Sequence, residues 1–137
     1  MKKLFLIGLV CLSLFGCMSF NKDTGQTYEY TITENKPHYK VALLWLAESI
    51  DDSKSSIEFQ DEEMQVVNGS VVISGDIYDK CFDYTIKVTD LTVTVSCSNF
   101  RQGEKKALIT KMSEYNSFKK DTSKFAESLF NYFDTYQ

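Results

Sequence analysis

The sequence predicts a single two-layer α+β domain, in which helices cover one face of an antiparallel sheet of about four or five strands. Three observations lead to this prediction. Apolar and polar residues alternate in several short segments, which is the period of a half-buried strand. Longer segments repeat their apolar residues at helical spacing. About 110 of the 137 residues remain once the N-terminal leader is set aside, which suits one domain.

The first sixteen residues are typical of a bacterial lipoprotein signal peptide. Two lysines precede an apolar run over residues 4–15, which is shorter than the roughly 20 residues of a membrane-spanning helix. The run ends in Leu14-Phe15-Gly16-Cys17, which resembles a lipobox, where the cysteine is lipidated and becomes the new N-terminus. We therefore expect a signal peptide over 1–16 and lipidation at Cys17. An ordinary signal peptide or anchor that contains a cysteine is the alternative.

Residues 17–26 are expected to form the lipidated N-terminus and a tether, and residues 27–137 the domain. Met18 stands where an aspartate would favour the inner membrane, so by resemblance to known sorting rules we expect the outer membrane, facing the periplasm. Cleavage leaves 13 basic and 19 acidic side chains, a net charge of −6. An acidic body leaves membrane attachment to the acyl chains and argues against nucleic acid as a partner.

The first strand and the first helix follow from a change of period. Apolar and polar side chains alternate over 27–33, which predicts a strand. Pro37 suits the first turn of a helix. Apolar residues then recur at helical spacing from Tyr39 to Ile50, which predicts a helix with one buried side.

A β-hairpin is predicted next. Alternation over residues 57–59 indicates a strand. Asn68-Gly69 is a strong signal for a two-residue turn, because both residues tolerate positive φ angles. Such a turn would place Val66 opposite Val71.

Two further segments are predicted to pair as antiparallel strands. Their apolar residues are even-numbered in Phe82–Val88 and odd-numbered in Leu91–Cys97. Burying both sets on one face requires even positions to pair with odd ones. A turn at 89–90 satisfies this, and a register shifted by two does so equally, so both registers stay open. We also expect Gly75 opposite Tyr84, where the missing side chain leaves room for the ring.

The end of the chain is predicted to be helical. One helix is expected over 104–115, and a last helix is expected after a cap at Asp121, Thr122 or Ser123. The last helix has an aromatic stripe, for which core packing is a commoner role than a ligand site.

Several of these segments together resemble a known family. They are the helix at 39–50, the segment Ile57-Glu58-Phe59-Gln60-Asp61, Asn68-Gly69 and the strand pair at 82–100. Over about residues 27–100 they resemble a bacterial domain of unknown function with a TATA-binding-protein-like (TBP-like) fold. The resemblance implies a curved sheet in the order strand–helix–strands–helix, in a small exported and often lipid-anchored protein. It brings no catalytic residues, and DNA binding does not follow from the name of the fold.

Few residues point to catalysis or to metal binding. His38 is the only histidine, and because no nucleophile elbow accompanies it, we expect a solvent-facing side chain. Asp51-Asp52 and Asp61-Glu62-Glu63 could bind a cation or form a catalytic pair, but solvated loops are the favoured interpretation. Zinc, calcium-loop and phosphate-loop spacings are absent from the sequence, so we expect no cofactor and no enzyme. A small periplasmic hydrolase or lyase that uses His38 or the acidic residues is the alternative.

Two cysteines, Cys81 and Cys97, remain in the predicted domain. An oxidising envelope favours a disulfide between them. Cys97 shares the parity of the apolar residues of its strand, whereas Cys81 has the opposite parity, so a regular pairing would place the two side chains on different faces. A bulge near Cys81 could redirect the Cys81 side chain. The sequence leaves the disulfide open.

The polar face of the sheet is the predicted binding surface. Thr85, Lys87, Thr94 and Ser96 form a hydroxyl-rich, weakly charged stripe, and Tyr78 is expected nearby. Such a face could bind an envelope protein, a peptide or a glycan, while an exposed sheet that uses threonine for its strand propensity is the simpler interpretation. We therefore expect a lipid-anchored, non-enzymatic binding or accessory module. A purely structural lipoprotein is a further alternative.

Overall fold

A computed structural model describes residues 25–50, 55–103, 107–108 and 112–137. Three predictions lie outside these residues: the signal peptide, lipidation at Cys17 and the acidic pair Asp51-Asp52. Most of the tether also lies outside them, as does the start of the helix expected from residue 104.

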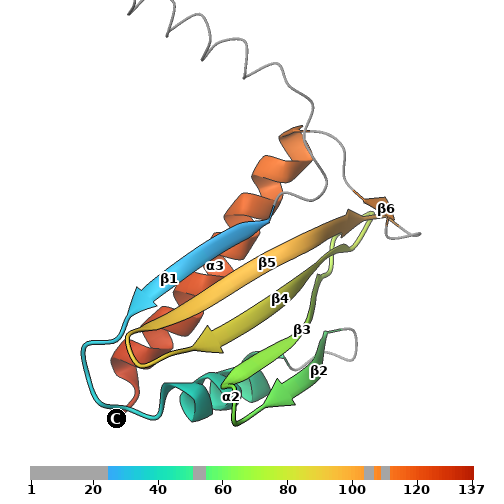
Figure 1. Ribbon diagram of the computed structural model, residues 1–137. Coiled ribbons are helices and arrows are strands. Elements are labelled where there is room, and N and C mark those ends of the chain that lie inside the picture. The colour runs from blue at the N-terminus through green and yellow to red at the C-terminus, as the bar shows by residue number, and fades with distance from the viewer. Residues whose placement is uncertain (1–24, 51–54, 104–106, 109–111) are drawn as a thin grey trace, which may run out of the picture.

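A curved antiparallel sheet forms one layer of the domain (Figure 1). Its main path has the order β1-β5-β4-β3-β2, and the short β6 pairs with the end of β5. The strands are β1 (Gln26–Thr31), β2 (Ser56–Asp61), β3 (Val66–Ile73), β4 (Lys80–Val88), β5 (Thr92–Gln102) and β6 (Ala107–Leu108). β5, β4 and β3 are therefore flanked on both sides by other strands, and β4 is the central strand of the sheet.

Two helices in the described part of the chain, α2 (His38–Ser49) and α3 (Met112–Thr135), form the second layer. Both pack against the same face of the sheet, behind the strands in Figure 1. The predicted α+β class, the strand–helix–strands–helix order and the helices on one face are confirmed.

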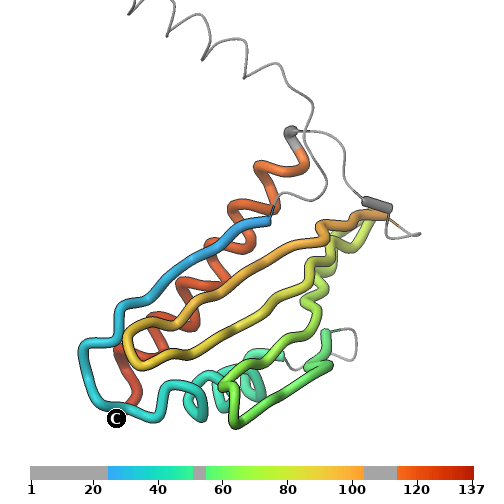
Figure 2. The backbone as a smooth tube through the Cα atoms, viewed as in Figure 1, coloured from blue at the N-terminus to red at the C-terminus, as the bar shows by residue number. Residues whose placement is uncertain are grey.

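The predicted parity is also confirmed. The even-numbered apolar residues of β4 and Val93, Val95 and Cys97 of β5 are buried. Of the two open registers, the structure has the shifted one, in which Val88 pairs with Val93. Leu91 is left in the turn that Figure 2 traces between β4 and β5, where it is 74% exposed.

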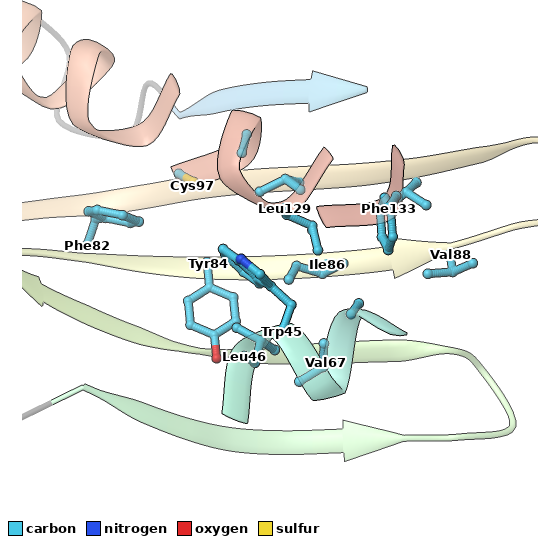
Figure 3. Packing of buried hydrophobic residues seen from close by; sticks show 14 of the residues in the cluster. Trp45, Leu46, Val67, Phe82, Tyr84, Ile86, Val88, Cys97, Leu129 and Phe133 are labelled. Atoms are coloured by element: carbon cyan, nitrogen blue, oxygen red, sulfur yellow. The ribbon is translucent and has the colours of Figure 1, made fainter. Parts of the chain in front are cut away.

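The core lies between this sheet face and the helices. Trp45 and Leu46 of α2 and Leu129 and Phe133 of α3 point toward the side chains of β4 (Figure 3). The aromatic side chains of α3 belong to this core or pack against it, which agrees with the packing role expected for them.

The hairpin predicted at Asn68-Gly69 is wrong, because both residues lie inside β3. The turn between β2 and β3 is formed instead by residues 62–65, where Gln65 has a positive φ of 54°. Asp61 stabilises it, since its Oδ1 accepts a hydrogen bond of 2.8 Å from the Met64 N–H. The turn at residues 62–65, which Asp61 closes with this hydrogen bond, thus takes the place of the turn predicted at Asn68-Gly69.

Gly69, rather than Gly75, lies opposite Tyr84. A Cβ atom at Gly69 would lie 2.0 Å from the Ser56 carbonyl oxygen and 2.8 Å from the Tyr84 hydroxyl oxygen. A glycine does lie opposite Tyr84 because a side chain there would collide with it, as predicted. The prediction that this glycine is Gly75 was wrong. The same crowding explains why Asn68-Gly69 stays in a strand: the glycine is needed there for close packing.

The C-terminal region differs from the two helices that were predicted. Ala107–Leu108 form β6, and α3 then runs without a break through the expected cap at 121–123. Thr122 is fully buried, and its Oγ1 lies 2.8 Å from the Tyr28 hydroxyl oxygen. Thr122 would favour the start of a helix, but its contact with β1 places it inside α3.

Candidate functional site

The face of the sheet opposite the helices presents polar side chains in rows that cross the strands. In one row each residue is paired with the next on the neighbouring strand, and the row consists of Thr27, Ser96, Thr85, Asn68 and Phe59. Three of these side chains are hydroxyls and one is an amide. Phe59 ends the row at the β2 edge and is 51% exposed.

The next row is centred on the exposed side chain of Lys87, on the central strand β4. It consists of Glu29, Thr94, Lys87, Val66 and Asp61. Lys87 forms no ion pair with the part of the chain that the structure describes. The two acidic members lie on the edge strands, so the centre of the face has one cation among hydroxyl groups.

The structure thus brings four of the five predicted face residues together. Thr85 pairs with Ser96, and Lys87 pairs with Thr94. Tyr78 is not with them, because β3 ends at Ile73 and Tyr78 lies in the connection to β4. Its expected place beside the face is therefore wrong.

A charged network that the sequence analysis missed lies on the same face. The Asp83 carboxylate accepts hydrogen bonds from Ser70 Oγ at 2.8 Å, Arg101 Nη2 at 2.6 Å and Asn99 Nδ2 at 2.7 Å. The parity of Asp83, which it shares with Thr85 and Lys87, could have placed it on this face. Arg101 lies beyond the strand pair recognised at 82–100, so its role depends on the longer β5 of the structure.

Cys81 and Cys97 are thiols in the structure, so the disulfide that the sequence left open is not formed. Arg101 Nη2 lies 3.0 Å from Cys81 Sγ, next to the Asp83 network of the open face. Cys97 belongs to the core on the other face, where burial raises its pKa to about 12. The opposite parity of the two cysteines therefore separates them.

A cleft of about 450 Å³ lies at the start of α2. His38, Lys36, Glu62 and Asp90 are among the residues that line it, so it brings the histidine together with one member of the acidic loop. The expectation of a solvent-facing His38 is wrong, since the residue is only 4% exposed. Its ring packs edge-on against Phe133 with 5.0 Å between centroids, because α3 and β1 close over the start of α2.

The His38 ring is also tied to the backbone. Its Nδ1 lies 2.9 Å from the Lys36 carbonyl oxygen, which makes Nδ1 the donor in the neutral ring. Glu62 is exposed on the other side of the cleft, in the turn between β2 and β3. The cleft is thus a second, weaker candidate site, in which His38 has limited access to solvent.

Among the described residues, no three His, Cys, Asp or Glu side chains are grouped so that they could hold a metal ion. No helix in the described part of the chain is both long enough and apolar enough to cross a membrane.

The comparisons with known proteins concern the fold. No family model matches the sequence, and no curated protein matches it either. A DUF4468 family protein from Bacteroides ovatus has a similar structure, with a TM-score of 0.55 and 14% identity over 84% of this chain and 86% of the other. A TBP-like protein from Parabacteroides distasonis is similar with a TM-score of 0.51 and 15% identity over 67% of each chain. The chain therefore has the fold of TBP-like proteins and of a domain of unknown function.

Proposed function

We propose that this protein is a lipid-anchored component of a bacterial cell envelope and a non-enzymatic binding or accessory module. The observation behind this proposal is the open sheet face, where Thr85, Ser96, Lys87 and Thr94 lie together on the neighbouring strands β4 and β5. The lipobox-like segment that ends at Cys17 supports the anchoring.

The chemistry of the face indicates a polar partner. Its hydroxyl and amide groups can donate and accept hydrogen bonds, as an envelope protein, a peptide or a glycan requires. Among the described residues the face has Lys87 at its centre, Arg101 paired with Asp83, and Glu29 and Asp61 at its edges, whereas a nucleic-acid surface needs clustered lysine and arginine. The predicted net charge of −6 after signal cleavage opposes nucleic acid further.

A triple variant tests the binding face. Replacing Thr85, Thr94 and Ser96 together with arginine should abolish capture of a partner from envelope extracts, because the substitution removes three hydroxyl groups and places three long cations on the face. The control replaces Ser49, Ser123 and Thr135, which lie on the helices, and should capture as the wild type does. Crosslinking in intact cells, followed by mass spectrometry, identifies the partner. Unchanged capture by the face variant would refute the binding face.

Metabolic labelling with a fatty-acid analogue tests the anchor. The label should be incorporated into the wild type and lost in Cys17→Ala, because the thiol is the acylated group. Retained label in Cys17→Ala would refute lipidation at this residue. Outer-membrane location, facing the periplasm, is tested by separating the two membranes and by protease treatment of intact cells.

A second candidate function is that of a small hydrolase or lyase, because the cleft brings His38 and Glu62 to one place. Turnover of a substrate that disappears in His38→Ala would establish this function. Full biological activity of that variant would exclude it. A purely structural lipoprotein, the third possibility, predicts that crosslinking identifies no partner.

A further inference from the structure

The connection between β3 and β4 holds two apolar side chains out into solvent. Ile77 is 81% exposed and Tyr78 is 49% exposed. The connection closes on itself, since a Cβ atom at Gly75 would lie only 2.2 Å from the Tyr78 carbonyl oxygen. Ile77 therefore lies at the tip of a closed turn.

Asp79 fixes the base of this turn to the end of β5. Its Oδ1 accepts a hydrogen bond of 3.4 Å from the Gly75 N–H, and its carbonyl oxygen accepts one of 3.3 Å from the Gly103 N–H. The base of the turn is thus connected to the end of the sheet, and Ile77 is exposed at its tip.

The N-terminal chain enters the domain pointing toward the same end. Gln26 pairs with Cys97, and Gly25 lies next to Ser98. Because β1 and β5 are antiparallel, Gly25 lies on the side of Gln26 that faces the end of β5, where Gly103 contacts the turn. Figure 2 shows the start of β1 and the connection between β3 and β4 toward the same end of the sheet.

The chain before Gln26 is long enough to place Cys17 level with this tip. The eight residues between them span at most about 30 Å. The five steps from Ser98 to Gly103, just after β5, cover at most about 17 Å. A lipidated Cys17 can therefore lie in a bilayer that the tip also touches.

The opposite end of the sheet also exposes apolar residues, Leu91 at 74% and Met64 at 64%. To bring that end to the bilayer, however, the tether would have to reverse and run back past the whole of β1. Glu62, Glu63 and Asp90 lie in the turns there and would meet anionic headgroups. Among the described residues, the turn at Ile77 has fewer acids, namely Asp76 and the hydrogen-bonded Asp79.

We infer that Ile77 and Tyr78 contact the lipid bilayer to which Cys17 tethers the protein. Ile77 enters the boundary of the acyl chains, and Tyr78 lies among the headgroups, where its ring and hydroxyl suit an interface. This inference rests on the proposed lipid anchor and adds an orientation to it. The strands then run roughly perpendicular to the membrane plane. The open face does not point toward the bilayer and stays accessible to a partner.

Tryptophan fluorescence tests this contact. Acylated full-length Ile77→Trp and Leu91→Trp variants are bound to phosphatidylethanolamine–phosphatidylglycerol vesicles with brominated or ordinary acyl chains. Brominated chains should cause a loss of fluorescence in Ile77→Trp and none in Leu91→Trp. The wild type serves as the blank, because Trp45 is only 4% exposed. Both substituted positions are exposed, so neither replacement should affect folding.

Flotation of the same samples separates the contact from the anchor. Protein that floats with the vesicles but shows no quenching in Ile77→Trp overturns the contact and leaves the anchor intact. Equal quenching in both variants, or quenching in Leu91→Trp alone, also overturns it. Protein that does not float overturns the anchor and the contact together.

Discussion

Gly69 lies directly opposite Tyr84, and the Tyr84 hydroxyl donates a hydrogen bond of 3.2 Å to the Ser56 carbonyl oxygen beside it. The hydroxyl and the β2 backbone occupy the space that a side chain at position 69 would need. β2 and β3 shift register at this point, between Ile57 and Phe59. The close packing of β2, β3 and β4 at this point therefore requires a residue without a side chain at position 69.

Gly69→Ala should lower the free energy of unfolding by about 3 kcal/mol, near the upper end for overpacked cores, because the nearest neighbour is backbone. Urea denaturation followed by circular dichroism measures the change. Asn68→Ala, one residue away on the open face, is the control and should shift stability by no more than about 0.5 kcal/mol. Equal stability of the two variants would contradict the close packing at Gly69.

Asp83→Ala should destabilise the domain by about 2 kcal/mol, because it leaves the half-buried Arg101 guanidinium without its carboxylate partner. A double-mutant cycle with Arg101→Ala checks this origin. Adding Arg101→Ala to Asp83→Ala should then cost less than it does in the wild type, since its carboxylate partner is already absent and the second substitution removes an unpaired cation. Additive costs would show that the two side chains act independently.

Stability should fall as the pH rises from 9 toward 12, in part because of Cys97. Burial raises the pKa of its thiol from 9.0 to about 12. The folded state therefore keeps a proton that the unfolded state releases above pH 9, and the stabilisation is complete only below that pH. Urea denaturation at pH 8 and pH 10 measures the effect.

In Cys97→Ala the loss of stability between pH 8 and pH 10 should be smaller than in the wild type, although this variant is less stable at both pH values. The tyrosines with raised pKa values, such as Tyr84, are common to both proteins and cancel in the comparison. An identical pH dependence would contradict a buried thiol at this position.

Thr122→Val should cost about 1 kcal/mol, because it keeps the shape of the side chain and removes the hydrogen bond to Tyr28. Thr135→Val is the matched control, since that hydroxyl is exposed and bonds only to carbonyl oxygens of its own helix. Thermal denaturation compares the two. A cost as large in Thr135→Val would assign the effect to the helix itself rather than to its contact with β1.

The sequence predicted the elements better than their connections. Alternation in β4 and β5 identified the buried face, because a period of two allows only two choices for each strand. It could not choose the register, since a shift by two buries the same set of residues. The network of Asp83 and Arg101 was missed for a related reason: only the pairing across β4 and β5 brings these two residues together.

Two errors show where local preference was overruled. Asn68-Gly69 has strong turn propensity, yet it stays in β3 because Tyr84 and the β2 backbone fill the space around the glycine. Asp121-Thr122-Ser123 suits a helix start, yet α3 continues through it, since Thr122 bonds to Tyr28 and Asp121 pairs with Lys80 at 2.7 Å. In both places, contacts with residues distant in the sequence outweigh a preference of the order of 1 kcal/mol.

Side-chain periodicity was thus enough to establish the α+β class, the order of the elements and the face that the helices cover, because burial is a property of each segment. The composition of the open face followed from the same periodicity. Folding in three dimensions determined which hydroxyl groups stand side by side, the separation of Cys81 from Cys97, the burial of His38 and the removal of Tyr78 from the face. These depend on register and on the ends of strands, where a shift of a few residues changes every neighbour and leaves the hydrophobic pattern unchanged.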